Sequence, residues 1–215
     1  MKKRLEILGL FAVLALPACA AQLEPTDDGD DAGWLHPDGG AIDEWIPMGH
    51  FRVKYQGDVV HVRVNATSYE SFRYFDLDAV ANDEDPARWD LRFQRMAVEM
   101  NGGVTGEGGV VALVLDGVSF DEVSVAPASG YSAPVPDSDD RDQYADSVFT
   151  GDHDEPGNAW YEYTVDGHVL TPRPWVYVVK STEGRAYKLA FDGYYDEAGS
   201  PANVQFRFAE IDLPD

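Results

Sequence analysis

Residues 89–103 limit the possible folds of this chain more than any other stretch. Apolar and polar residues alternate from position 91 to position 100, and the phase of the alternation changes once, at 95–96. Alternation with a period of two is typical of a strand, and a single change of phase is typical of a β-bulge. Asn-Gly-Gly at 101–103 is a turn signal, and an apolar run follows at 110–115. We therefore predict a long bulged strand, a glycine-rich turn and a buried strand.

Short runs of this kind recur along the rest of the chain. Alternating or apolar runs lie at 51–55, 59–64, 160–165, 175–180, 186–191 and 204–208. A strand with a bend is predicted at 67–80, a long surface loop at 126–147 and a connection at 193–201. Short strands joined by turns, without a long amphipathic helix, are typical of an all-β domain. We predict an antiparallel sandwich or a barrel-like domain.

The first 19 residues have the pattern of a bacterial lipoprotein signal. Lys2, Lys3 and Arg4 are basic, residues 5–16 are almost entirely apolar, and Leu-Pro-Ala-Cys ends at Cys19. Cys19 is the only cysteine of the chain. We therefore predict a signal peptide at 1–18 and a lipidated Cys19 as the first residue of the mature protein. An ordinary secretory cleavage site with a chance cysteine is the alternative.

The residues after Cys19 predict a tethered lipoprotein of the outer membrane. Ala20 and Ala21 follow the cysteine, where lipoproteins retained at the inner membrane carry aspartate. We therefore expect the protein in the outer membrane of a Gram-negative bacterium, on its surface or its periplasmic face. Residues 19–45 are rich in Asp, Gly and Pro and predict an acidic flexible tether, which leaves 46–215 as the folded domain.

The charge of the chain excludes one class of partner. There are 39 acidic residues against 16 lysines and arginines, which gives a net charge of −23. Such a surface repels nucleic acid and anionic membrane faces, so we expect no nucleic-acid partner and membrane attachment through the lipid alone. Solubility, or a salty habitat, explains this acidity, and binding of cations by the excess carboxylates is the alternative.

The sequence holds no recognisable catalytic set. It has no Gly-x-Ser-x-Gly elbow, no Walker loop and no cysteine outside the signal, so we predict that the protein is not an enzyme. Histidine is a good axial ligand for haem iron and a good ligand for zinc. Of the five histidines, His153 and His168 flank the strand predicted at 160–165. These two form the best candidate pair of ligands.

The sequence of residues 89–95 and 101–103 resembles that of the HmuY family of haem-binding bacterial lipoproteins. Further segments match that family in order, and together they cover about residues 58–210: 66–75, 108–110, 130–131, 160–163, 176–180, 186–191, 194–195 and 204–208. The resemblance implies an all-β domain shaped like a hand. It also implies that the residues at 89, 93 and 101–103 build the core and its turn.

In function, the resemblance implies a non-enzymatic lipoprotein for iron acquisition. Such a protein binds haem between two histidines and passes it to an outer-membrane receptor. The family's first haem histidine falls in a segment that corresponds to 132–148 here, which has no histidine. The second falls near Val165, three positions before His168. The two ligands of the family therefore do not carry over directly to this chain. The cofactor that the resemblance implies is haem, and if the protein binds it, we expect the candidate pair His153 and His168 as its ligands. Some members use methionine, but Met96 and Met100 are expected in the wrong strand for that.

Two other functions remain open at the level of sequence. The domain could keep the fold without the haem site and contact a protein or a glycan. Exposed aromatic residues such as Tyr131, Trp175 or Tyr195, lining a groove without histidines, would favour that function. A hydrolase is the third hypothesis, and no nucleophile or metal-binding set supports it.

Overall fold

The computed structural model describes residues 44–137, 144–150 and 159–214. All of them belong to the second of two compact units into which the chain divides, residues 33–215. The regular structure of this part is almost entirely β. Its elements are β1 (Ile46–Met48), β2 (Phe51–Gln56), β3 (Val59–Asn65), β4 (Arg73–Asp76), β5 (Ala81–Asn82), β6 (Leu91–Gln94), β7 (Ala97–Met100), β8 (Val111–Leu115), the 3-10 helix η1 (Phe120–Glu122), β9 (Tyr161–Thr164), β10 (Val169–Pro172), β11 (Val176–Lys180), β12 (Ala186–Tyr195) and β13 (Pro201–Ile211).

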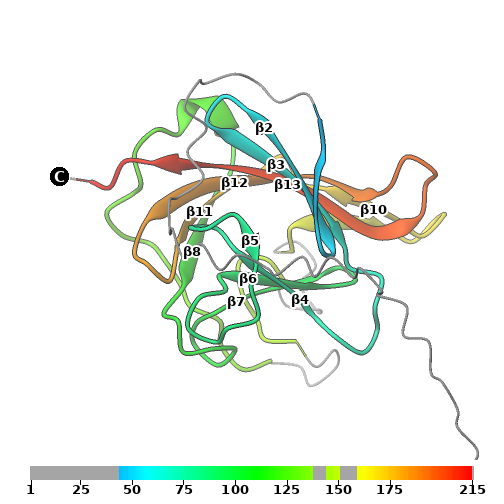
Figure 1. The fold of residues 1–215 in the computed structure, drawn as a ribbon, viewed down its shortest axis with the longest axis horizontal. Coiled ribbons are helices and arrows are strands. Elements are labelled where there is room, and N and C mark those ends of the chain that lie inside the picture. The colour runs from blue at the N-terminus through cyan, green and yellow to red at the C-terminus, as the bar shows by residue number, and fades with distance from the viewer. Residues whose placement is uncertain (1–43, 138–143, 151–158, 215) are drawn as a thin grey trace, which may run out of the picture. The chain divides into compact units, whose positions relative to one another are not determined.

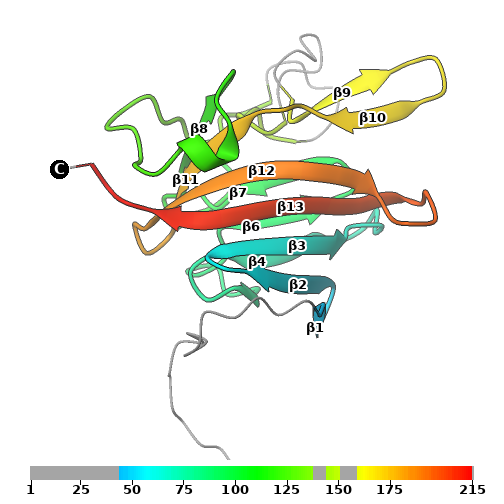
Figure 2. The same cartoon turned by 90° about the horizontal axis from the view of Figure 1, so that it is seen from above.

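The strands form three antiparallel sheets (Figures 1 and 2). A large sheet has the order β1-β2-β3-β13-β12-β11-β8, a small sheet has the order β5-β4-β6-β7, and β9 and β10 pair only with each other. The large sheet is open, because β1 and β8 are its two edges. The all-β prediction is therefore confirmed, as an open sandwich and not a closed barrel.

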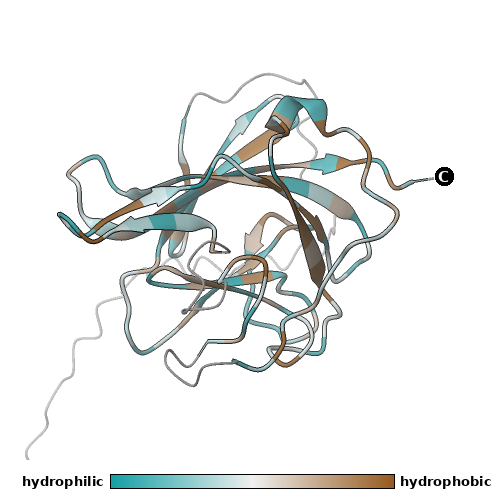
Figure 3. Ribbon diagram, turned by 180° about the vertical axis from the view of Figure 1, so that it is seen from behind, coloured by the Kyte–Doolittle hydropathy of each residue, from teal (hydrophilic) through white to brown (hydrophobic). Residues whose placement is uncertain are grey.

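Aromatic side chains between the large and small sheets form the main core. Phe206 of the large sheet stacks on Phe93 of the small sheet with ring centroids 5.3 Å apart, and it meets Phe75 edge-on at 5.7 Å. Residues of β3 alternate between buried and half-buried along its length, which is the pattern of a strand with one face on a core. Figure 3 shows the apolar strands of the large sheet curving over the small sheet. Each such aromatic pair adds roughly 0.5–1.5 kcal/mol to the effect of burial.

A second apolar cluster lies on the other side of the large sheet. Phe120 of η1 and Val123 are both buried there, against Val178 of β11 and Ala209 of β13. The connection at 116–131 therefore covers one end of this face. Phe120 belongs to the single 3-10 turn of the described residues, Phe120–Glu122.

The residues at 91–100 form a hairpin, so the predicted long bulged strand is wrong. β6 and β7 pair antiparallel, with Gln94 opposite Ala97, and Arg95-Met96 is the two-residue turn between them. Arg95 has a φ of +55°, and its N–H donates to the carbonyl of Ala66 at 2.8 Å. The change of phase in the sequence is thus a reversal of the chain. Glycine or asparagine usually marks such a turn, and neither is present here.

Two other predicted boundaries are corrected. The strand predicted at 67–80 is only β4, because the chain turns at 77–80 after four paired residues. The connection predicted at 193–201 is shorter than expected, because β12 continues to Tyr195 and β13 begins at Pro201. The pairing of β12 with β13 is irregular at Gly193. This interrupts the alternation of apolar and polar residues, so the sequence does not predict that β12 continues to Tyr195.

The carboxylate of Asp90 joins the two sheets. This side chain is fully buried. Its Oδ2 accepts a hydrogen bond from the N–H of Leu77, after β4, at 2.7 Å, and its Oδ1 accepts one from the N–H of Thr182, after β11, at 2.7 Å. Hydrogen bonds to a buried ionised group are among the stronger ones in proteins. One residue of the 89–103 stretch thus fixes a turn of each sheet.

Asn101 performs a similar task in the glycine-rich turn. Its Nδ2 donates to the carbonyls of Pro86 and Trp89, each at 2.8 Å, and its Oδ1 accepts from the N–H of Gly108 at 3.0 Å. A Cβ on Gly102 would lie 2.1 Å from the carbonyl oxygen of Val110, so only glycine fits there. Trp89 is buried beside this turn. The predicted core and turn are therefore confirmed.

We predict that the stability of the protein falls as pH rises toward neutrality, because of Asp90. Burial raises the pKa of Asp90 to about 7, and the nearby Asp78 and Asp76 add to the shift. A carboxyl group whose pKa is higher in the folded state stabilises the fold below its unfolded pKa, and that contribution is lost as pH rises through the folded pKa. The slope for one group is about 1.4 kcal/mol per pH unit.

The measurement is urea unfolding in EDTA-containing buffer between pH 5 and pH 8, for the wild type and for Asp90→Asn. His61 acts in the opposite direction, because burial and the charges of Arg207 and Lys54 lower its pKa. The difference between the two proteins cancels that effect. We expect the wild type to lose stability relative to Asp90→Asn up to about pH 7, and a constant difference would contradict the assignment.

Candidate functional site

The structure describes one of the two predicted haem ligands. His168 lies in the turn between β9 and β10, is exposed, and has a φ of +54°. Its Nδ1 lies 2.5 Å from the hydroxyl of Tyr163. His153 lies outside the described residues, as do Cys19, the signal at 1–18 and the tether up to residue 43. The pairing of His153 with His168 therefore stays a prediction.

The strands β9 and β10 form an arm that carries exposed apolar side chains. They pair from Tyr161 with Pro172 to Thr164 with Val169, and Figure 2 shows them projecting beside the large sheet. The exposed fraction is 50% for Tyr163, 74% for Val165 and 44% for Val169. Tyr163 is paired with Leu170 and Val169 with Thr164, so Tyr163 and Val169 point to opposite faces of the arm. Its exposed apolar side chains make the arm a candidate interaction site.

The base of this arm is fixed to the rest of the domain. Trp160 is fully buried, stacks on Phe191 of β12 at 4.4 Å, and donates its indole N–H to the carbonyl of Met96 at 2.8 Å. The N–H of Leu170 in β10 donates to the hydroxyl of Tyr195 at 3.0 Å. The Trp-Tyr sequence at 160–161 therefore anchors the arm, while its tip at 165–168 is free of the sheets.

The β6–β7 turn lies beside the base of the arm. Met96 is 44% exposed, and the guanidinium of Arg95 stacks over the ring of the exposed Tyr69 at 4.4 Å. The expectation that Met96 lies within a strand is wrong, because it occupies the turn that contacts Trp160. Met100 is fully buried in the core and is not available to a surface ligand.

The chemistry of these residues suits one side of a haem group. An imidazole bonded through Nδ1 to Tyr163 keeps its Nε2 for a metal, which is the usual arrangement of a ligating histidine. The apolar side chains of the arm suit a porphyrin face, and the charge of Arg95 suits the carboxylates of a porphyrin edge. The other described histidines do not lie on the arm: His50 follows β1, and His61 lies in β3 opposite Arg207. Within residues 44–137, 144–150 and 159–214 the site thus has a single imidazole.

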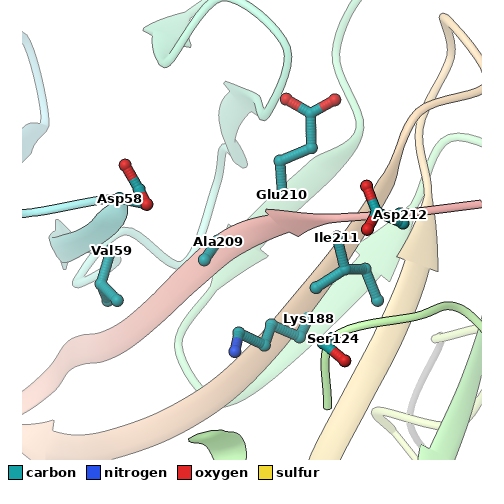
Figure 4. A pocket seen from close by; sticks show the side chains of 8 residues that line it. All are labelled: Asp58, Val59, Ser124, Lys188, Ala209, Glu210, Ile211 and Asp212. Atoms are coloured by element: carbon teal, nitrogen blue, oxygen red, sulfur yellow. The ribbon is translucent and has the colours of Figure 1, made fainter.

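Two hollows of the described surface do not suit haem better. One hollow of about 390 Å³ lies over β13 (Figure 4). Half of its lining residues are charged, and the full lining consists of Asp58, Val59, Ser124, Lys188, Ala209, Glu210, Ile211 and Asp212. A second hollow of about 470 Å³ runs from Tyr69 over β4, with residues 70–74, Glu84 and Gln94. Haem pockets are mostly apolar and need an axial ligand, and neither lining includes a histidine.

The aromatic residues named for the alternative function are engaged in different places. Tyr131 lies under the ammonium of Lys180 at 4.3 Å. Trp175 donates its indole N–H to Asp116 at 2.9 Å. Tyr195 accepts the hydrogen bond from the arm. None of the three lines either hollow.

Comparison with known proteins identifies the family. The family model described as HmuY protein matches residues 68–208. The chain belongs to the HmuY family. No match is found among curated proteins. No helix within the described ranges has the length and apolar character needed to cross a membrane.

Solved structures with the same fold have low sequence identity to this HmuY-family chain. A candidate lipoprotein from Bacteroides fragilis is 20% identical with a TM-score of 0.53, and the match covers 81% of this chain and 96% of that one. A candidate HmuY-like haem-binding protein from Bacteroides vulgatus is 15% identical with a TM-score of 0.50, covering 71% and 91%. Apo PinO from Porphyromonas gingivitis is 17% identical with a TM-score of 0.50, covering 73% and 98%. These matches show the fold.

We predict that Tyr195→Phe loosens the arm without unfolding the domain. The substitution removes the oxygen that accepts the Leu170 N–H, and one such hydrogen bond contributes about 1 kcal/mol. We expect the Leu170 amide to exchange with solvent roughly fivefold faster, measured by NMR. Tyr194→Phe is the matched control, since the Tyr194 ring packs against Tyr195 at 5.2 Å without that bond. Equal exchange of Leu170 in both variants would show that the bond does not hold the arm.

Proposed function

We propose that the protein is a non-enzymatic haem-binding lipoprotein of the outer membrane, which captures haem and passes it to an outer-membrane receptor. One observation carries the proposal: in a chain of the HmuY family, an exposed histidine on an apolar arm has its Nδ1 already bonded to Tyr163. The haem iron supplies the coordination chemistry, and the chain supplies ligand, apolar surface and charge.

Each residue of the site has a distinct part in this proposal. His168 provides Nε2 as one axial ligand, and the Tyr163 hydroxyl fixes the orientation of the ring. His153 provides the second ligand. Val165 and Val169 cover the apolar face, and Arg95 pairs with the carboxylates of the haem edge. Lipidation at Cys19 holds the domain at the membrane.

Titration of the soluble chain from residue 20 with haemin tests the proposal. We expect a shifted Soret band, and at least about tenfold weaker binding for His168→Ala and for His153→Ala. Tyr163→Phe keeps the imidazole and loses the hydroxyl, and loss of such an outer-shell partner weakens metal sites by about 10- to 100-fold. His50→Ala, which removes an exposed histidine away from the arm, is the control.

Three results of this titration would contradict the proposal. The first is no Soret shift with the wild type. The second is equal binding by His168→Ala and the wild type. The third is equal loss of binding with His50→Ala. A fourth result would change the second ligand. If His153→Ala binds haem normally and Met96→Ala does not, the second ligand is the exposed thioether of Met96 in the β6–β7 turn.

The alternative function is a module that binds a protein or a glycan through the arm. The exposure of Tyr163 and Tyr69, at 50% and 78%, favours it, because aromatic side chains dominate many binding surfaces. Absence of a Soret shift, together with binding of a protein or glycan that Tyr163→Ala abolishes, would support this second function.

A further inference from the structure

Three carboxylates lie together at the junction of the two sheets. Asp76 ends β4, Asp78 follows it by two residues, and Asp90 precedes β6. One oxygen from each of the three lies within 4.8 Å of the other two. Among the described residues this is the one group of three or more acidic, histidine or cysteine side chains with that geometry. All three lie at the ends of strands of the small sheet or in its turns, and not in the arm.

One oxygen of this group lacks a hydrogen-bond partner. The Asp78 side chain is only 3% exposed. Its Oδ1 accepts hydrogen bonds from the hydroxyls of Ser181 at 2.8 Å and Tyr187 at 2.9 Å. Its Oδ2 is buried and receives no donor from the described part of the chain. A buried carboxylate oxygen without a partner is costly, so the position calls for a positive partner.

The surrounding side chains do not supply enough positive charge to balance the three carboxylates. The cation paired with Asp78 in the described part of the chain is Arg185, whose Nη1 lies 3.7 Å from Oδ1 of Asp78 and which also pairs with Glu210. One arginine shared in this way does not balance three carboxylates. Burial raises the pKa of the Tyr187 hydroxyl, and the charge of Asp78 raises it further.

We propose that Asp76, Asp78 and Asp90 bind a calcium ion. Calcium prefers oxygen ligands at about 2.3–2.6 Å, so oxygens on opposite sides of the ion are up to about 5 Å apart, and the three carboxylate oxygens fit on one such sphere. Calcium also tolerates irregular geometry, whereas magnesium demands a near-ideal octahedron at about 2.1 Å. Both Asp90 oxygens are fixed by backbone N–H groups, and such a fixed ligand suits the less demanding ion. Water supplies the remaining ligands.

The ion would strengthen the contact between the sheets. Asp90 already links Leu77 of the small sheet to Thr182 of the large one, and Asp78 meets Ser181 and Tyr187 of the large sheet. A cation between these carboxylates binds the folded chain and not the unfolded one, so it stabilises the fold by mass action. This role is independent of haem binding.

Thermal unfolding of the soluble chain from residue 20 tests the calcium site. The protein is stripped with EDTA at pH 8, and calcium, magnesium or sodium chloride is added at matched ionic strength. We expect calcium to raise the unfolding midpoint by roughly 5–10 °C at about 100 times its Kd. Magnesium should have a smaller effect, and sodium none beyond that of ionic strength. No specific effect of calcium would overturn the proposal.

Asp78→Asn is the decisive variant. The oxygen of the new amide would still accept the hydrogen bonds from Ser181 and Tyr187. The amide nitrogen would take the place of Oδ2, which accepts no hydrogen bond in the described part of the chain. We expect the calcium response to vanish while the midpoint in EDTA stays equal or rises. Glu107→Gln, at an exposed position outside the cluster, is the control and should keep the response. A calcium response that survives in Asp78→Asn would place the ion elsewhere.

A measurement on the wild type covers the case in which the variant fails to fold. Terbium replaces calcium in oxygen sites, and its emission on excitation of a nearby tryptophan reports its binding. Trp89 directly precedes Asp90, so we expect sensitised terbium emission that calcium displaces. Absence of such emission would count against the site.

Discussion

The carboxylate of Asp90 is the contact on which the two-sheet arrangement depends. It is buried, and its two oxygens take one backbone N–H from a turn of each sheet. Those N–H groups would otherwise lack acceptors away from water, which is costly. The same burial makes the negative charge expensive, which is why the pKa of Asp90 rises to about 7. The junction is therefore a strong geometric restraint that benefits from a proton or a cation.

The frame built on this junction leaves the arm free to carry a ligand. Trp160 and Tyr195 fix its base to β12 and to the β6–β7 turn, while the turn with His168 lies in solvent. Rigid sheets that present a variable turn are a common basis for binding sites. Apart from Arg95, residues of the family motif serve the frame, and the proposed haem ligands lie outside that motif.

The sequence predicts the parts of this structure that depend on local pattern. Alternation predicts β3 and the final strand, and Asn-Gly-Gly predicts the turn that Asn101 closes. The hairpin at Arg95 was missed because its left-handed residue is neither glycine nor asparagine. The carboxylate cluster was missed because no periodicity links Asp90 to Asp76 and Asp78, which a turn and β5 separate from it. Likewise, the bond of Tyr163 to His168 depends on how the turn folds.

Hydrogen exchange of the soluble chain with and without haemin, read by mass spectrometry, tests the separation of frame and site most directly. The account predicts slower exchange with haemin in β9, β10 and the β6–β7 turn. Exchange at Leu77 and Thr182, the two amides bound to Asp90, should stay unchanged. Protection confined to the sheet junction, or no protection anywhere on the arm, would contradict it.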